Sequence, residues 1–326
     1  MKNVISIKIG VIGVGHLGNF HLKQLSEIPE ISVSGFYDID QKRAGAISKA
    51  YKIPSFSSLE SLLDSSDAVS VVTPTNLHYN IAIQALNAGC HVFIEKPITD
   101  NLSHAGALLN KADELKKIIQ VGHIERFNSA FMALKKTAVD PRFIETHRLA
   151  PFNPRGNDVP VILDLMIHDL DIILSLVDSK IQDIRANGVK VVSQTADIAN
   201  ARLEFANGCV ANVTASRIAQ KEMRKIRLFQ EDNYITIDFL EGILEEYKVC
   251  HEKIDDTAAD NVVQIGTDNT KYILYNRPVI EKHDALREEL RHFIHSIQHA
   301  NQPETDGYSA TEALRLALDI QSIIDQ

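Results

Sequence analysis

The feature that most constrains the fold is a glycine-rich turn, Gly13-Val14-Gly15-His16-Leu17-Gly18, between an apolar run at Ile7–Ile12 and a segment with helical periodicity. Glycines at this spacing between a strand and a helix are typical of a dinucleotide-binding turn. The first permits a sharp turn, the second leaves room for a pyrophosphate, and the third lets the helix pack closely on its strand. The phosphates would lie at the helix N-terminus, where N–H groups and the helix dipole favour an anion.

Asp38 follows the next apolar run, Ile31–Tyr37, where the ribose of a dinucleotide would lie. Its carboxylate could accept hydrogen bonds from the 2′- and 3′-hydroxyl groups of NAD, whereas the 2′-phosphate of NADP would meet a like charge. A capping or turn aspartate is the structural alternative, and the nearby Lys42 and Arg43 keep NADP open as an alternative cofactor. The sequence therefore predicts NAD, with NADP less favoured.

The first part of the chain alternates short apolar runs with helix-length segments. The expected strands are Ile7–Ile12, Ile31–Tyr37, Ala68–Val72, His91–Ile94 and Ile118–Val121. The expected helices are His16–Glu27, Gln41–Tyr51, Leu59–Leu63, His78–Ala88 and Ser103–Lys116. Because alternating strands and helices connect by right-handed crossovers, this pattern predicts an α/β domain with a doubly wound parallel sheet of the Rossmann type.

The pattern changes after Gly122, and from Ile181 to about Tyr275 strands follow one another without intervening helices. The expected strands are Arg142–Leu149, Ala199–Phe205, Cys209–Ser216, Lys225–Gln230, Tyr234–Asp238, Ile243–Val249 and Lys271–Tyr275. Asn207-Gly208 is a strong hairpin signal between two of them. We interpret Cys250–Asp268 as a loop, and Asp284–His299 and Ser309–Ile324 as amphipathic helices. The sequence thus predicts a C-terminal α+β domain with an open, mostly antiparallel sheet covered by helices.

These patterns predict two domains, a Rossmann domain over residues 1–122 and a substrate-binding and oligomerisation domain over residues 123–326. The net charge of -9 argues against nucleic acid or a membrane surface as partner, because the field repels phosphates. Three cysteines without a C-x-x-C pair argue against a disulfide framework or a zinc knuckle. The apolar N-terminus is interpreted as a strand and not as a signal peptide. We therefore expect a cytoplasmic protein that binds small molecules.

Polar residues follow two later strands, in the stretches Val72-Thr73-Pro74-Thr75-Asn76-Leu77-His78 and Glu95-Lys96-Pro97. In a doubly wound sheet the carboxyl ends of the strands line the ligand crevice. The predicted cofactor-binding residues are therefore Gly13, Gly15, His16, Leu17, Gly18, Asp38, Thr73, Pro74, Asn76, His78, Glu95 and Lys96. The ammonium group of Lys96 could stabilise negative charge on a reacting oxygen, and an exposed Glu–Lys pair is the alternative.

A third polar group interrupts the apolar helix pattern at Val161–Val177. Asp164, His168 and Asp171 share one helix face at the spacing i, i+4, i+7. Polar groups in an apolar helix are costly unless they serve a site or bond one another. A divalent metal site and a buried structural histidine are alternatives. Because a nicotinamide domain precedes this helix, we interpret His168 as an acid–base residue oriented by a carboxylate, and we expect no metal.

With these residues in hand, the sequence resembles the Gfo/Idh/MocA family of nicotinamide-dependent sugar and cyclitol dehydrogenases. The resemblance covers nearly the whole chain, and its motifs are Gly13-x-Gly15-x-x-Gly18, Thr73-Pro74-x-x-x-His78, Glu95-Lys96-Pro97, Asp164-x-x-x-His168-x-x-Asp171 and Leu286-x-x-Glu289-Leu290. It implies that Lys96, Asp164 and His168 face the nicotinamide and the substrate carbon, and that the bond before Pro97 is cis. It also implies that the open sheet pairs with another subunit, in a homodimer or homotetramer.

Three stretches together resemble a branch of sugar-nucleotide 3-dehydrogenases that includes enzymes acting on UDP-N-acetylglucosamine: Val121-Gly122-His123-Ile124-Glu125-Arg126-Phe127-Asn128, Arg155–Asp158 and Leu165–Asp171. The predicted substrate-binding residues are Arg126, Asn128, Arg155 and Asp171, with Arg148 as a further candidate for a phosphate or carboxylate. The family often has a glycine pair before its Asp-x-x-x-His motif. This chain has Val159-Pro160-Val161, so we expect the loop that enters the helix to differ.

The sequence therefore predicts an enzyme that reversibly oxidises a secondary hydroxyl of a sugar, cyclitol or UDP-sugar to a ketone with NAD. In this hypothesis His168 removes the hydroxyl proton, Lys96 stabilises the developing oxyanion and Asp164 orients the substrate or the imidazole. One alternative is an enzyme of the same architecture acting on a dihydrodiol or biliverdin. Another is a non-catalytic NAD(H) sensor, which would not need these three side chains.

Overall fold

The computed structural model describes residues 6–153, 159–250, 262–265 and 271–326. Contacts along the chain divide it into two compact units, which are described separately. Unit 1 is Met1–Phe127 with Asp284–Arg315, and unit 2 is Asn128–His283 with Leu316–Gln326. The division thus differs from the predicted single boundary after residue 122, because the late segment Asp284–Arg315 belongs to unit 1.

Unit 1 is built on a parallel five-stranded sheet with the strand order β2-β1-β3-β4-β5. The strands are β1 (Ile7–Ile12), β2 (Ile31–Tyr37), β3 (Ala68–Val71), β4 (His91–Glu95) and β5 (Ile119–Gly122). The helical segments are α1 (His16–Ser26), α2 (Gln41–Tyr51), α3 (Leu59–Asp64), α4 (Thr75–Asn87), α5 (Leu102–Leu115), η1 (Ile124–Phe127), α8 (Ala285–His299) and the first part of α9 (Gly307–Ile324). The predicted doubly wound sheet is confirmed.

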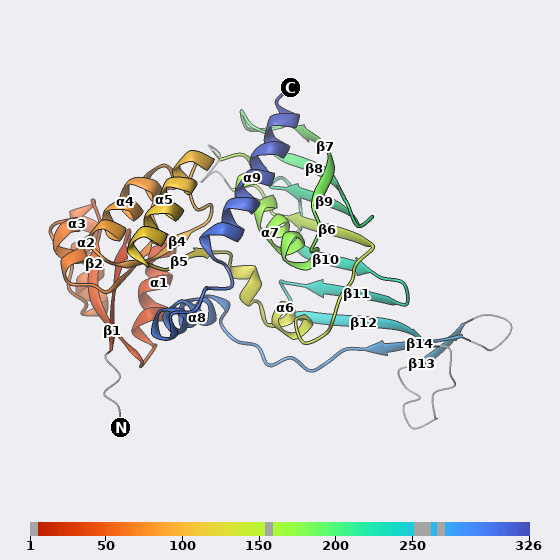
Figure 1. Ribbon diagram of the computed structural model, residues 1–326, viewed down its shortest axis with the longest axis horizontal. Coiled ribbons are helices and arrows are strands. Elements are labelled where there is room, and N and C mark those ends of the chain that lie inside the picture. The colour runs from red at the N-terminus through yellow and green to blue at the C-terminus, as the bar shows by residue number, and fades with distance from the viewer. Residues whose placement is uncertain (1–5, 154–158, 251–261, 266–270) are drawn as a thin grey trace. The chain divides into compact units, whose positions relative to one another are not determined.

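Helices cover both faces of this sheet, and Figure 1 shows α4 and α5 on one side with α1 and α8 on the other. Leu22 of α1, Phe93 of β4 and Phe293 of α8 belong to one buried apolar core. The rings of Phe93 and Phe293 meet edge to face, with centroids 5.8 Å apart. The late helix α8 therefore belongs to unit 1 because its apolar face completes the core on that side of the sheet.

Unit 2 is built on a nine-stranded sheet with the order β13-β14-β12-β11-β10-β6-β9-β8-β7. Its strands are β6 (Phe143–Leu149), β7 (Ile181–Val189), β8 (Ile198–Phe205), β9 (Val210–Ser216), β10 (Met223–Phe229), β11 (Asn233–Asp238), β12 (Ile243–Cys250), β13 (Val262–Ile265) and β14 (Lys271–Asn276). All neighbouring pairs are antiparallel except β6 and β9. The predicted mostly antiparallel sheet is confirmed, including the hairpin at Asn207-Gly208, where Gly208 has φ +85°.

Two local predictions for unit 2 were wrong or incomplete. The range Cys250–Asp268 is not entirely a loop, because the backbone of β13 pairs with β14. A short helix, α6 (Ser129–Leu134), follows Asn128 where no helix was expected. In both places a run of four to six residues is too short for periodicity to reveal the element.

Helices cover one face of the nine-stranded sheet. Strand β6 alternates buried Ile144, Thr146 and Arg148 with half-buried neighbours, as expected for a sheet with one covered face. Figure 1 shows α6, α7 (Ile167–Leu176) and the end of α9 on the same side of this sheet. A Cβ atom at Gly188 of β7 would lie 2.7 Å from Cγ2 of Ile324, so the glycine allows the end of α9 to approach the sheet.

The apolar segment predicted as one helix is interrupted. A π-helical turn, η2 (Ile162–Met166), precedes α7. Residues of η2 contact β9, and residues of α7 contact both β6 and β9. Among the described helices, none is long and apolar enough to cross a membrane.

Candidate active site

The glycine turn of unit 1 has the geometry that its sequence predicts. Gly13 has φ +86°, and a Cβ atom there would lie 2.6 Å from the carbonyl oxygen of Val72. A Cβ atom at Gly18 would lie 1.9 Å from the carbonyl oxygen of Gly13, whereas at Gly15 it would meet nothing within 4 Å. Gly13 and Gly18 are therefore required by the fold, and Gly15 leaves open space in front of the turn.

Polar groups around this turn fit a bound dinucleotide. Gly15 is the N-cap of α1 and provides no side-chain hydrogen bond to the first-turn N–H groups, which remain suited to a phosphate. His16 and Leu17 follow in the first turn and are exposed. The hydroxyl oxygen of Thr73, after β3, is buried and has no hydrogen-bond partner in the described part of the chain. This geometry suits the dinucleotide that the sequence predicts.

Asp38 ties the end of β2 to the glycine turn. One carboxylate oxygen accepts the N–H group of Val14 at 2.9 Å, and the other accepts that of Asp40 at 2.8 Å. A guanidinium nitrogen of Arg43 lies 3.3 Å from Oδ2 of Asp38. The same nitrogen lies 3.4 Å from Oδ1, so each oxygen accepts two hydrogen bonds, and ribose hydroxyl groups would take the positions that the exposed Arg43 guanidinium occupies.

His78 connects the loops that follow β3 and β4. Its side chain is buried, with Nδ1 2.9 Å from the carbonyl oxygen of Pro97 and Nε2 2.8 Å from that of Thr73. Burial lowers the pKa of His78, although both carbonyl groups act in the opposite direction. Pro74, the N-cap of α4, and Asn76, in the first turn of that helix, are exposed. The Lys96-Pro97 peptide bond is cis, as the family resemblance implies.

Sequence reasoning missed two residues beside Glu95. His21 of α1 is fully buried, with Nδ1 2.9 Å from the hydroxyl of Ser70 and Nε2 3.0 Å from Oε1 of Glu95. The other carboxylate oxygen, Oε2, accepts the backbone N–H group of Lys96 at 3.2 Å. Burial would raise the pKa of Glu95, but the hydrogen bond and charge of His21, together with the charge and the backbone N–H group of Lys96, outweigh it and lower the pKa. The available signals were a histidine on the core side of α1 and a serine inside the wholly buried β3.

In unit 2, Asp164 lies in the π-helical turn and His168 in the first turn of α7. Both side chains are half-buried, whereas Asp171 is only 3% exposed. The expectation that all three share a regular α-helical spacing was wrong for Asp164, because a π turn holds more residues per turn. Such turns occur frequently at functional sites.

A buried ion pair lies beside His168. Arg148 of β6 bonds Asp169 of α7 through Nε to Oδ2 at 3.1 Å and through Nη2 to Oδ1 at 2.8 Å, and both side chains are 3% exposed. This bidentate arrangement fixes α7 on the covered face of the sheet. The guanidinium considered for a substrate phosphate is therefore occupied by a carboxylate of its own unit.

A second buried pair holds the segment that leads into η2. Arg217 donates to the carbonyl oxygen of Val159 at 2.6 Å and to Oδ1 of Asp197 at 2.9 Å. Oδ2 of Asp197 accepts three successive backbone N–H groups, those of Val191, Val192 and Ser193, at 2.7, 2.7 and 3.0 Å. Burial would raise the pKa of Asp197, but these N–H groups outweigh it and lower the pKa. Arg217 thus anchors Val159, the first residue of the Val159-Pro160-Val161 segment that leads into η2.

The remaining predicted substrate residues have structural contacts or lie outside the described residues. Arg126 is 8% exposed and donates to the carbonyl oxygen of Glu304 at 3.3 Å within unit 1. Asn128 caps α6, where its Oδ1 accepts the N–H group of Ala130, and its Nδ2 donates to the carbonyl oxygen of Phe239. Arg155 lies outside the described residues.

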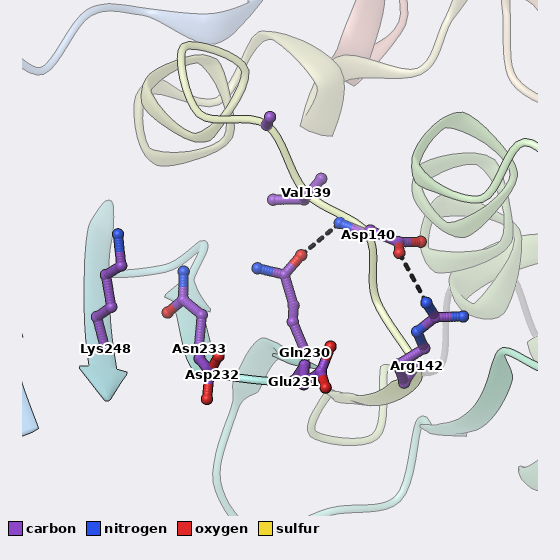
Figure 2. Close-up of a pocket in the computed structure, with 9 residues that line it drawn as sticks. Val139, Asp140, Arg142, Gln230, Glu231, Asp232, Asn233 and Lys248 are labelled. Carbon is purple, nitrogen blue, oxygen red and sulfur yellow. Dashed lines mark hydrogen bonds and ion pairs between the residues drawn. The ribbon is translucent and has the colours of Figure 1, made fainter. Parts of the chain in front are cut away.

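No group of three or more His, Cys, Asp or Glu side chains is arranged to hold a metal ion among the described residues. A polar pocket of about 360 Å³ lies elsewhere in unit 2, before β6 and at the turn between β10 and β11 (Figure 2). There the N–H group of Asp140 donates to Gln230, and the Asp140 carboxylate pairs with Arg142 at 3.1 Å. The pocket contains none of the predicted site residues.

Comparison with known proteins identifies the family. The family described as "Oxidoreductase family, NAD-binding Rossmann fold" matches residues 7–123, and "GFO/IDH/MocA C-terminal domain" matches residues 114–245. The chain is 36% identical over 323 residues to UDP-N-acetylglucosamine 3-dehydrogenase of Acidithiobacillus ferrooxidans, covering 99% of this chain and 98% of the relative. A solved structure of that enzyme superposes with a TM-score of 0.89 at 35% identity, covering 98% of both chains.

More distant relatives share the fold. The chain is 24% identical over 343 residues to myo-inositol 2-dehydrogenase of Thermotoga maritima, covering 98% of this chain and 97% of the relative. Scyllo-inositol dehydrogenase of Lactobacillus casei, solved with NAD(H) and scyllo-inositol, has a TM-score of 0.77 at 19% identity, covering 98% and 97%. The predicted fold, cofactor and enzyme class are thereby confirmed, and the chain belongs to the Gfo/Idh/MocA family of NAD-dependent oxidoreductases.

Proposed function

We propose that this chain oxidises the 3-hydroxyl group of UDP-N-acetylglucosamine, or of a closely similar UDP-sugar, to a ketone. The observation that carries the proposal is the 36% identity with UDP-N-acetylglucosamine 3-dehydrogenase along essentially the full length of both proteins. Identity with the inositol dehydrogenase is lower, at 24% over a similar span. A sugar nucleotide is therefore favoured over a free cyclitol.

In the proposed reaction His168 accepts the proton of the substrate hydroxyl group as general base. The ammonium group of Lys96 stabilises the negative charge that develops on the same oxygen, and Asp164 orients the substrate or the imidazole. NAD, when bound, supplies the hydride acceptor. The half-buried state of Asp164 and His168 supports these roles, because a ligand can reach both side chains.

The substrate-binding assignments of Arg126, Asn128, Arg155 and Asp171 stay predictions. Arg126 and Asn128 already bond protein carbonyl groups, which supports a role in shaping the surrounding loops. Arg155 is the remaining candidate for a phosphate of the substrate. Exchange of Arg155 for methionine should raise KM for a UDP-sugar more than it lowers kcat if the guanidinium binds a phosphate in ground state and transition state alike.

The substrate proposal is tested by following NADH formation with UDP-N-acetylglucosamine, free N-acetylglucosamine and myo-inositol at matched concentrations. We expect kcat/KM to be about 100-fold higher for the UDP-sugar, because the nucleotide supplies binding energy that the free compounds lack. Turnover of myo-inositol alone would overturn the proposal. Tight NADH binding without turnover of any compound would instead favour the sensor.

The catalytic assignments are tested by Lys96→Met and His168→Ala. Each should lower kcat by about 100-fold or more while NADH binding persists, because an electrostatic or acid–base contribution is lost. A matched control is Lys111→Met on α5, whose ammonium group pairs with Glu114 at 2.6 Å on the surface. Full activity of Lys96→Met or His168→Ala would contradict the assigned roles.

We also propose that the uncovered face of the nine-stranded sheet pairs with a second copy of the chain. Aromatic side chains from five neighbouring strands form a continuous row on that face, Phe143, Phe229, Tyr234, Tyr247 and Tyr275. Successive ring centroids are 5.6, 4.8, 5.4 and 5.0 Å apart. Aromatic residues are enriched in the cores of protein interfaces, which supports a self-complementary contact here.

Sedimentation of Tyr234→Asp/Tyr247→Asp tests this contact. We expect the variant to sediment as a monomer, because two charges would be buried at the centre of the interface. Val279→Asp is the control, since Val279 is fully exposed and lies outside the aromatic row. A monomeric unmodified chain, or an unchanged assembly of the double variant, would contradict the proposal.

We further infer a cytoplasmic location from the thiols. All three cysteines are free, and burial raises the pKa of Cys90 and of Cys209 to about 11. Free thiols persist in reducing compartments, where disulfides are rare. Cell fractionation followed by thiol labelling tests this location. Recovery of the protein in an oxidising compartment would contradict it.

A further inference from the structure

Buried histidines hold the chain on both sides of Lys96. On one side, Glu95 is bonded by His21. On the other side, the carbonyl oxygen of Pro97 lies 2.9 Å from Nδ1 of His78. Lys96 itself is half-buried between these two fixed points, at the carboxyl end of β4.

The contact with His21 has a defined direction. The lowered pKa of Glu95 keeps its carboxylate ionised at neutral pH, and an ionised carboxylate can only accept hydrogen bonds. Nε2 of His21 therefore carries the hydrogen that lies between the two side chains. Ser70 contacts the opposite ring nitrogen at 2.9 Å and fixes the orientation of the imidazole.

The carboxylate of Glu95 has little room to move. A Cβ atom at Gly122 of β5 would lie 2.8 Å from both of its oxygen atoms. The ring of Phe93 packs edge to face on the His21 imidazole, with centroids 5.5 Å apart. Glu95 is thus confined between β5 and His21, and its second oxygen holds the backbone N–H group of Lys96.

We propose that His21, acting through Glu95, is a positioning residue for Lys96: the bonds from His21 to Glu95 and from Glu95 to the Lys96 N–H group set where the lysine side chain originates. This inference rests on the proposed role of Lys96 in stabilising the oxyanion. A misplacement of about 1 Å at a reacting centre can cost about 100-fold in rate. Because the lysine side chain is long and flexible, a fixed position of the Lys96 backbone helps to place its ammonium group.

Two substitutions at His21 separate positioning from packing. His21→Leu fills a similar volume and removes both ring hydrogen bonds, whereas His21→Gln retains an N–H donor that can reach Glu95. We expect His21→Leu to lower kcat about 10- to 100-fold with KM for NAD changed by less than about threefold, and His21→Gln to recover most of the loss. Ser26→Ala on the same helix is the control, because Ser26 bonds only the carbonyl oxygen of Leu22 among the described residues.

The same substitution in a Lys96→Met background tests the route of the effect. If His21 acts by placing Lys96, His21→Leu should lower kcat no further once the lysine is absent. Loss of the same factor in both backgrounds would show that His21 acts elsewhere, and the proposal would be overturned.

A readout without substrate keeps this test independent of the proposed function. Reductive methylation with ¹³C-formaldehyde labels the lysines, and the Lys96 resonance is the one missing from Lys96→Met. His21→Leu should shift or broaden this resonance, while His21→Gln and Ser26→Ala should leave it in place. An unchanged Lys96 resonance in a folded His21→Leu variant would overturn the positioning role. Full activity of Lys96→Met with a shifted resonance would instead overturn only the proposed catalytic role.

Discussion

The two units hold their site residues by different physical means. In unit 1 the glycine turn is fixed by sterics, since a side chain at Gly13 or Gly18 would strike a carbonyl oxygen. In unit 2 the helix that carries His168 is fixed by charge, because Arg148 bonds Asp169 beneath it. We therefore expect different changes to destabilise the two regions. Added side-chain volume should destabilise the glycine turn of unit 1, and loss of a charge or a change of pH should destabilise unit 2.

The largest effect is expected from Arg148→Met. This change leaves the Asp169 carboxylate, on a side chain that is 3% exposed, without its guanidinium partner. Removal of one member of a buried pair costs about 3–5 kcal/mol. Urea unfolding should therefore show a loss of that size in the free energy of unfolding. The double variant Arg148→Met/Asp169→Leu should recover much of it, and a loss below about 1 kcal/mol in the single variant would contradict a charge-held helix.

A smaller effect is expected from an added methyl group in the glycine turn. Gly18→Ala places Cβ 1.9 Å from a backbone oxygen, which cannot be relieved by a side-chain rotation. We expect a loss of about 3 kcal/mol in unfolding free energy, at the upper end of overpacking effects. Gly15→Ala meets nothing within 4 Å, so it should fold normally and weaken only NADH binding, measured by fluorescence titration. Equal melting temperatures of the two variants would contradict the steric account.

Asp197→Asn probes the second charge-held anchor of unit 2. Backbone N–H groups hold the pKa of Asp197 below its usual value of 3.8, so this carboxylate stabilises the fold above pH 3.8 and loses that contribution as pH falls further. At neutral pH we expect Asp197→Asn to lower the free energy of unfolding in urea by about 2 kcal/mol, which is typical of hydrogen bonds to a charged group. The difference from the unmodified chain should shrink in acid. A difference that persists at low pH would show that packing, not charge, is lost.

The contrast between the units also explains what could be predicted from the sequence. Glycine spacing reports steric requirements directly, so the turn, its strand and its helix were predicted within a few residues. The pairing of Arg148 with Asp169 depends on β6 lying under α7, which no local pattern encodes. Arg148 was therefore considered for a substrate phosphate although its partner lies in its own unit.

Hydrophobic periodicity also could not predict which residues share a face of the helix that carries His168. Counting residues at regular α-helical spacing places Asp164 with His168 and Asp171, but the π turn at Ile162–Met166 changes the register of Asp164. His21 and Ser70 were missed for a related reason, because each is a single polar residue in an apolar element and its partner is distant in sequence. Pairs of this kind become visible only when strand order is known.

The effect that is smallest at neutral pH concerns the acid stability of unit 1. Nδ1 of His91 accepts the N–H group of Ile118 at 3.0 Å, and burial together with the charge of Lys117 lowers the pKa of His91 from 6.5 to about 4. The unfolded chain therefore binds this proton first, and the stability contribution is lost as pH falls from 6.5 towards 4, by at most about 1.4 kcal/mol per pH unit. His91→Asn retains an acceptor oxygen but cannot titrate. The free energy of unfolding of this variant should therefore fall less steeply between pH 6.5 and 4, by up to about 1.4 kcal/mol per pH unit. Amide hydrogen exchange in β4 and β5 measures it, and the nine-stranded sheet, whose Asp197 titrates only in stronger acid, is the internal control. An equal acid loss in the variant would contradict this account. Protonated His91 has no lone pair left to accept the N–H group of Ile118, so its titration should add to the loss only in the unmodified chain.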